Sequence, residues 1–100
     1  MRNRHILKYD LPKVGGLVIK TGANPVVRSA GWQSGKLVTW IECDSSSQLD
    51  AGQVEMAVVG TGMEFQTDMV FVTTVQDSHG FVWHVFCEAK SMTGGQNAHR

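Results

Sequence analysis

Short segments in which apolar and polar residues alternate recur along the chain. Residues 53–59 place Val54, Met56 and Val58 on one side and more polar or smaller residues on the other. Residues 5–11 alternate in the same way. A period of two is typical of a strand with one buried face, and no 3.6-residue apolar period holds over an 11-residue window. The pattern therefore predicts strands and no long helix.

Turn-forming residues separate about seven such segments at intervals of roughly 8–12 residues. Ser34-Gly35 lies between two strand-like segments, 26–33 and 36–43, and predicts a hairpin. Gly31 suggests a β-bulge, and Pro25 should hold Asn24 in an extended conformation. We expect a small all-β, single-domain fold over residues 1–88. It should be an antiparallel β-sandwich or barrel of about seven strands, followed by a mobile C-terminal tail over residues 89–100.

The most apolar part of the chain is a predicted hairpin over residues 69–88. Its second strand should place Phe81, Trp83, Val85 and Cys87 on the inner face. The residues between them, Val82, His84 and Phe86, should then point to the opposite, outer face. Because both faces are apolar, we expect the outer one to be covered by a partner or a second layer. The expected aromatic core consists of Trp32, Trp40, Trp83, Phe71, Phe81 and Phe86. The candidate partner-binding residues are Val82, His84 and Phe86.

Charge is unevenly distributed although the formal net charge is zero. Residues 1–36 contain a single acid, Asp10, whereas residues 37–89 contain no Lys or Arg. The candidate basic patch, Arg2, Arg4 and Lys8, could meet phosphates or an acidic partner. The alternative, which we favour, is that basic strands pair with acidic strands across a sheet. A pI near 6.9 also argues against general nucleic-acid binding.

The sequence offers little support for metal, cofactor or catalytic chemistry. Cys43 and Cys87 form neither a disulfide framework nor a zinc motif, and we expect both to be small buried apolar groups. The segment Asp44-Ser45-Ser46-Ser47-Gln48 approaches a metal-adhesion pattern but has Gln at a ligand position, so we expect an exposed loop. No Gly-x-Ser-x-Gly elbow is present. We therefore expect no cofactor, no metal and no enzymatic activity.

Gly60-Thr61-Gly62 is a second candidate binding segment. Successive backbone N–H groups there could form an anion nest for a phosphate. The segment lacks the Lys and the following helix of a P-loop, so a sharp turn is the simpler interpretation.

Three motifs resemble a family of small bacteriophage proteins of unknown function. They are Ile6-Leu7-Lys8-Tyr9-Asp10-Leu11-Pro12, Gly60-Thr61-Gly62 and Phe81-Val82-Trp83-His84-Val85-Phe86, which match that family's LKYxLP, VxGTG and VWHVF elements in order. Val38-Thr39-Trp40 matches the central element approximately, and Cys87 replaces the closing acid. The similarity spans roughly residues 5–88. It implies a phage or prophage origin and a compact β fold, and it implies no activity.

The leading hypothesis is a non-catalytic accessory binding protein that acts in the host cytoplasm. Its target would be a host protein or a small nucleotide, as for a counter-defence factor. The alternatives are a minor virion or assembly component and, less favoured, nucleic-acid binding by the basic N-terminal strands. We expect a homodimer, formed through the outer face of the last hairpin or an edge strand. No apolar run reaches the roughly 18 residues of a membrane span.

Overall fold

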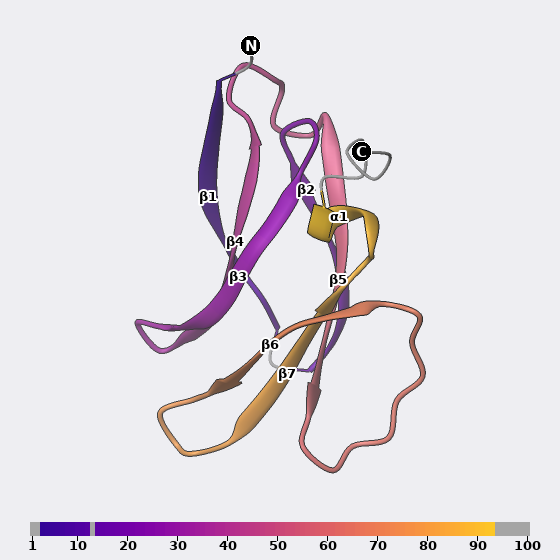
Figure 1. The fold of residues 1–100 in the computed structure, drawn as a ribbon. Coiled ribbons are helices and arrows are strands. Elements are labelled where there is room, and N and C mark those ends of the chain that lie inside the picture. Colours follow the sequence, from indigo (N-terminus) through magenta and orange to yellow (C-terminus); the bar gives the residue numbers. More distant parts are fainter. Residues whose placement is uncertain (1–2, 13, 94–100) are drawn as a thin grey trace.

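The computed structural model describes residues 3–12 and 14–93. Within these residues, seven strands and one short helix make up the fold (Figure 1), and this confirms the predicted all-β class. The elements are β1 (Arg4–Asp10), β2 (Gly15–Thr21), β3 (Val26–Gln33), β4 (Lys36–Asp44), β5 (Gly52–Gly60), β6 (Val70–Gln76), β7 (Val82–Cys87) and α1 (Lys90–Thr93).

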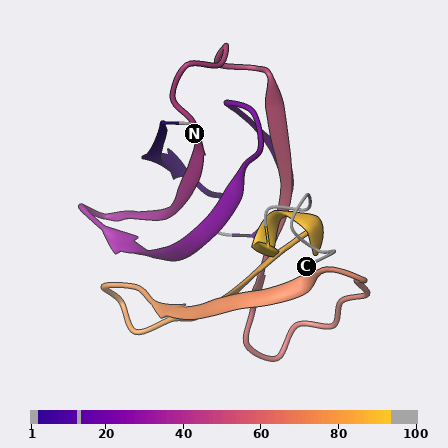
Figure 2. The same cartoon turned by 45° about the horizontal axis from the view of Figure 1, so that its top comes forward.

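The strands form two antiparallel sheets (Figure 2). One has three strands in the order β1-β4-β3, and the other has four in the order β2-β5-β7-β6. Both sheets contribute to a single core, which includes Ile41 of β4, Met56 of β5 and Val85 of β7, each of them fully buried. β3 also contacts β6, so the two sheets approach each other along that side.

The β3–β4 hairpin follows from its two-residue turn. Ser34 and Gly35 have φ values of 53° and 78°. Positive φ at both central positions is the type I′ geometry, whose twist matches that of the flanking strands. The expected bulge is displaced: the register shifts between Val27 and Ser29, whereas Gly31 pairs regularly with Val38. A Cβ at position 31 would lie 3.3 Å from the Trp40 ring, so this glycine admits a close approach instead of a bulge.

Asn24 differs from the extended conformation that Pro25 predicted. Its φ is 55°, in the left-handed region. Asn tolerates this region better than most residues, and its Nδ2 donates a hydrogen bond of 2.9 Å to Asp44 Oδ2. The tertiary contact therefore outweighs the local preference of a residue that precedes proline.

The core is aliphatic, in contrast to the aromatic core that the composition predicted. Among the described residues, no Phe or Trp is fully buried. Trp32 and Trp83 pack against the core from its edge, whereas Phe81 is 64% exposed because it precedes β7 and lies in the turn. Phe71 is also exposed and Trp40 and Phe86 are half-buried. Short branched side chains fill the space between the sheets, so the larger rings lie outside it.

The β6–β7 turn is organised by one buried carboxylate. Oδ1 of Asp77 accepts hydrogen bonds from the backbone N–H groups of His79 (2.8 Å) and Phe81 (3.0 Å). Its Oδ2 accepts from Trp83 Nε1 at 3.0 Å. Asp77 is 6% exposed, and these charge-assisted bonds stabilise an anion at that depth.

The C-terminal boundary lies later than expected. Residues from 89 onward were predicted to form a tail, but Lys90–Thr93 forms one helical turn. Ser91 is 1% exposed and Met92 packs against the core. Ser91 has a partner at that depth, because its Oγ donates to Glu88 Oε2. The remainder of the predicted tail, residues 94–100, lies outside the described residues.

Candidate docking surface

The outer face of the four-stranded sheet is apolar. Its register places Ala57, Phe86 and Phe71 in one row across β5, β7 and β6. Val54, Met56 and Val58 of β5 and Val85 and Cys87 of β7 face the core, so the intervening residues point outward. We call this surface the outer apolar face; it consists of Val18, Ala57, Val59, Phe65, Phe71, Val82 and Phe86.

Three phenylalanine rings form the centre of this face. Phe65 comes from the loop between β5 and β6, and its ring centroid lies 5.1 Å from that of Phe86. Phe71 meets Phe86 edge-on at 5.8 Å. Phe65 and Phe71 remain 48% and 53% exposed. The rings pack on one another in favourable tilted geometries while much of their apolar surface stays in contact with water.

His84 lies beside the phenylalanine cluster, and both of its ring nitrogens have partners. Nε2 is 2.7 Å from Thr61 Oγ1, and Nδ1 is 2.9 Å from Thr74 Oγ1. A hydroxyl can donate or accept, so either neutral tautomer satisfies both bonds. The sequence placed His84, Phe86 and Val82 on one face and Thr61 in a separate candidate site. The structure brings these residues together.

Gly60-Thr61-Gly62 forms a turn and is not an open nest. The Met63 N–H donates to the Gly60 carbonyl at 3.1 Å, and Gly62 has a φ of 88°. The Gly60 N–H points at Met63 Sδ (3.3 Å) and the Thr61 N–H donates to the Val82 carbonyl (3.3 Å). Two of the three N–H groups that a phosphate would require therefore have partners within the protein.

The turn leads into a long connection, residues 61–69, which Figures 1 and 2 show as a wide loop at one side of the four-stranded sheet. Residues 61–68 are exposed. Glu64, Phe65 and Gln66 line a shallow pocket with a volume of about 440 Å³. The loop is joined to the sheet by Thr61 at one end and by the packing of Phe65 on Phe86 further along.

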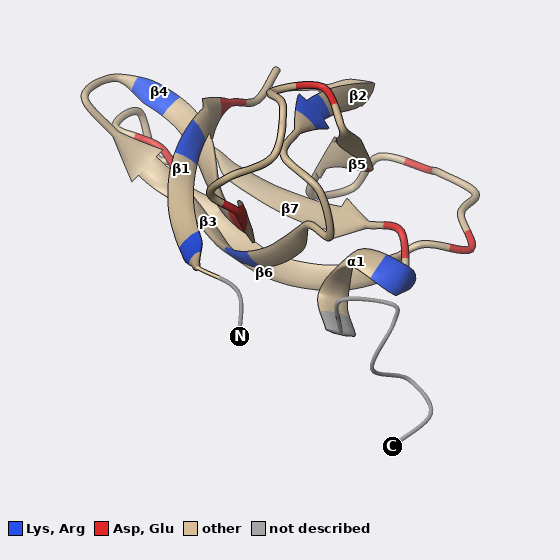
Figure 3. Cartoon of the chain, turned by 90° about the horizontal axis from the view of Figure 1, so that it is seen from above, with Lys and Arg blue, Asp and Glu red and all other residues tan. Residues whose placement is uncertain are grey.

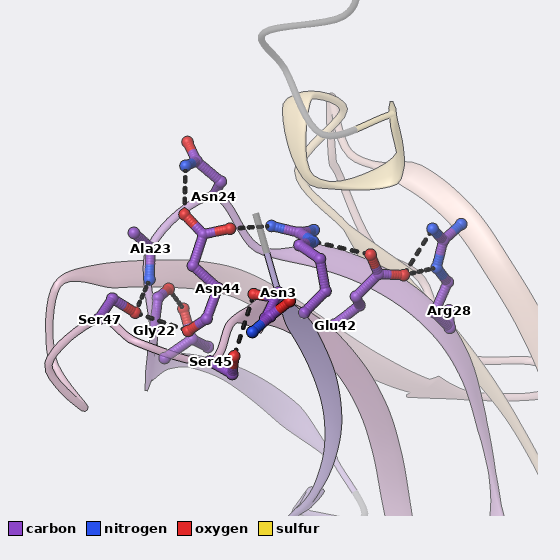
Figure 4. Close-up of polar contacts among 11 residues, drawn as sticks. Asn3, Gly22, Ala23, Asn24, Arg28, Glu42, Asp44, Ser45 and Ser47 are labelled. Atoms are coloured by element: carbon purple, nitrogen blue, oxygen red, sulfur yellow. Dashed lines mark hydrogen bonds and ion pairs between the residues drawn. The ribbon is translucent and has the colours of Figure 1, made fainter. Parts of the chain in front are cut away.

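The outer face of the three-stranded sheet carries, by contrast, a network of ion pairs at one end (Figure 4). Arg4 of β1 bonds Glu42 of β4 at 2.7 Å and Asp44 at 2.8 Å, and Arg28 of β3 bonds Glu42 from the other side at 2.6 Å. Hydrogen bonds from Arg4 and Arg28 lower the pKa of Glu42. These contacts confirm the cross-strand neutralisation that the charge pattern predicted.

The candidate basic patch is therefore not a single free surface. Arg4 is engaged by two carboxylates. Lys8 is exposed and donates to Gln33 Oε1 at 2.6 Å. Arg2 lies outside the described residues.

The serine-rich loop after β4 is held by its own polar groups. Asp44 accepts from Arg4 through Oδ1 and from Asn24 through Oδ2. Ser47 Oγ accepts from the Ala23 N–H and donates to the Asp44 carbonyl (Figure 4). These side chains join the loop to the end of β2. Within residues 3–12 and 14–93 no group of three His, Cys, Asp or Glu side chains could hold a metal ion.

Both cysteines are free and buried. Burial raises the pKa of the Cys87 thiol to about 12, and the neighbouring Glu88 carboxylate adds to this effect. Because the thiolate is the nucleophile, Cys87 is unreactive near neutral pH. The structure thus gives this thiol the packing role that the sequence suggested.

Of the outer apolar face, sequence reasoning identified Val82 and Phe86 only. It missed five members of the face and, beside His84, one hydrogen-bond partner: Val18, Ala57, Val59, Phe65, Phe71 and Thr74. Thr74 could have been found from the hairpin register, because a regular ladder with the observed turn places it opposite His84. Phe65 carried no signal, since it lies in an irregular loop whose path depends on the Thr61–His84 bond and on the ring of Phe86.

Among the described residues, no helix is long and apolar enough to cross a membrane.

Comparison with known proteins places the chain in one family. No match was found among curated proteins or among solved structures. A family model does match residues 2–95, which is nearly the whole chain. The chain belongs to the family described as Domain of unknown function (DUF7352).

Proposed function

We propose that this chain is a non-catalytic binding protein and that a partner protein docks on the outer apolar face. The observation that carries the proposal is the contrast between the two sheets. One outer face carries the Arg4, Glu42 and Arg28 network and, among the described residues, a single exposed large apolar side chain, Ile6. The other exposes Phe65 and Phe71 around Phe86. Contiguous apolar surface of this kind is typical of a protein interface, in which aromatic residues are enriched.

The charges around the face favour a protein over a nucleotide. Glu64 and Asp68 lie in the loop that carries Phe65. Glu55 lies on β5 opposite Val18, and it points to the same side of the sheet as Val18. Phosphate groups would be repelled by these carboxylates. The turn at Gly60 offers little compensation, because its first two N–H groups have internal partners.

The origin and location of the protein form part of the proposal. The resemblance of residues 5–88 to phage proteins supports a phage or prophage gene, and the target is then a protein of the host cytoplasm. A counter-defence or host-takeover factor would need no catalytic centre, since it acts by occupying its target.

The proposal is tested by photo-crosslinking in cells. A photoreactive phenylalanine analogue is placed at position 71, at the centre of the face, and at position 81 as the control. Phe81 is at least as exposed but lies in the β6–β7 turn and contacts Trp83 instead of Phe86. We expect a discrete cross-linked protein from position 71 that is lost when Phe65 is changed to Ala. Equal products from both positions would contradict the proposal.

A further inference from the structure

We infer that the segment occupying the outer apolar face carries lysine or arginine side chains among apolar ones. This inference rests on the proposed function and specifies the chemistry of the partner. It follows from the charges that surround the face and from the aromatic groups at its centre.

The strands and the loop that carry the phenylalanine cluster have charged residues of one sign only. Residues 37–89, which include β5, β6, β7 and the loop 61–69, contain no Lys or Arg. Figure 3 shows acidic positions along that loop and no basic one. Lys20 of β2 is on the same face but pairs with Gln53, which is four residues along β5 from Ala57, the partner of Phe86. Its Nζ donates to Gln53 Oε1 at 2.9 Å. A partner of opposite charge would be steered to the cluster and held in register.

The pocket beside the cluster combines a carboxylate with an aromatic ring. Glu64, Phe65 and Gln66 line its volume of about 440 Å³. A lysine or arginine has an alkyl stem that packs on apolar surface and a cationic head that remains hydrated or paired. The stem would pack on Phe65 and Phe86 while the head reaches Glu64, and the ring faces add a cation–π attraction.

A second copy of this chain fits the same face poorly. A two-fold contact places the same patch of both copies together. The Glu55, Glu64 and Asp68 carboxylates of one copy would then approach those of the other, and such like-charge contacts disfavour a complex. The occupant is therefore a different protein with a basic and apolar segment.

The inference is tested by selection from a random 12-residue peptide display library. Selected peptides are synthesised, and their affinities are measured by fluorescence anisotropy. We expect enrichment of Lys or Arg next to aromatic or aliphatic residues. The variant E64Q/D68N keeps the shape of the loop and should weaken binding about tenfold and flatten its salt dependence. The matched variant D10N/D50N removes two carboxylates from outside the outer apolar face and should leave the affinity unchanged.

The outcomes separate the two proposals. F65A/F71A should abolish binding of every selected peptide, with folding checked by circular dichroism. Peptides without basic residues that still require Phe65 and Phe71 would overturn the charge inference and leave the proposed function standing. If no selected peptide depends on Phe65 or Phe71, the proposed function is overturned as well. Concentration-dependent self-association that blocks the peptides would identify a second copy as the occupant and overturn the inference.

Discussion

At the scale of single residues, the structure is organised by a few carboxylates with defined donors. Asp77 holds a turn, Asp44 holds a loop, and Glu42 joins three strands. Their roles depend on partners that are distant in sequence, such as Arg4, which is 38 positions from Glu42. The sequence indicated charge pairing between the two halves of the chain, but only the strand register determines which acid meets which base.

Replacing Asp77 with Asn should destabilise the fold by about 2–3 kcal/mol. The amide oxygen can still accept from His79 and Phe81, but the amide nitrogen would face the Trp83 N–H and leave it without an acceptor. The measurement is urea denaturation, in which the midpoint should fall with an unchanged slope. D50N, in an exposed loop, is the control, and an equal midpoint for D77N and D50N would contradict this role of Asp77.

Stability should fall in acid through Glu42. Its pKa is lowered from the ordinary value of 4.5 by hydrogen bonds from Arg4 and Arg28. The unfolded chain therefore takes up a proton at a higher pH than the folded chain does. The contribution of the ionised group is fully present above about pH 5 and is lost as the pH falls through the lowered value. E42Q should cost about 1 kcal/mol at pH 7.

The two proteins are compared by urea denaturation at pH 7 and pH 3. The stability difference between wild type and E42Q should shrink at pH 3, because the unfolded chain is largely protonated at Glu42 below its ordinary pKa of 4.5 whereas the folded chain resists protonation. A difference that stays constant between the two pH values would show that the pairing has no role in acid sensitivity.

At the scale of elements, the strands and turns were predictable and the loop was not. Alternation places Val54, Met56 and Val58 inward, as the sequence indicated. Ser34-Gly35 specifies its hairpin locally, since the φ values of the turn suit these residues. The path of residues 61–69 depends, besides its local turn bonds, on contacts with distant residues: Thr61 bonds His84 and the Val82 carbonyl, and Phe65 packs on Phe86. These contacts have no local sequence pattern.

The bond between Thr61 and His84 should hold the start of this loop. T61V keeps the shape of the side chain and removes the hydroxyl. We therefore expect amide hydrogen exchange at Met63, whose N–H donates to the Gly60 carbonyl, to become about fivefold faster. T74V removes the other partner of the same ring and does not touch the loop, so it should leave that exchange unchanged. Equal effects of the two variants would show that His84 acts through its orientation and not through the Thr61 bond.

At the scale of the whole molecule, the class of fold followed from the spacing of strands, whereas the arrangement of surfaces required the structure. The hairpin at residues 69–88 was expected to bury most of its aromatic residues. Its inner face instead contributes Val85 and Cys87 to the core. Phe71 and Phe86 lie on the outer apolar face together with Phe65 of the loop 61–69. A period of two shows which residues share a face, but it does not show which face is covered.

Self-association remains a prediction. The contact that we expect for it is the edge strand β2, which could pair with the same strand of a second copy. In the described part of the chain, β2 has a ladder partner on one side only, β5. Val18 at its centre is 50% exposed. If this edge pairs with a second copy, sedimentation equilibrium should give twice the protomer mass, and V18K should return the mass to one protomer. A single-protomer mass for the wild type at high concentration would exclude this dimer.

The separation of charge along the chain also determines how the surface can be mapped. Trypsin cleaves after Lys and Arg, and none lies between Lys36 and Lys90. The strands β4 to β7 and the loop 61–69 therefore leave a digest as one peptide, residues 37–90. Cross-links at Phe65, Phe71 and Phe86 would all fall in this fragment and could not be told apart by its mass. A protease that cleaves before Asp would divide it at Asp44, Asp50, Asp68 and Asp77, and would place Phe65, Phe71 and Phe86 in three different peptides. Because each cut lies at an acid of the same stretch, the charge pattern that disfavours one digest makes the other suitable.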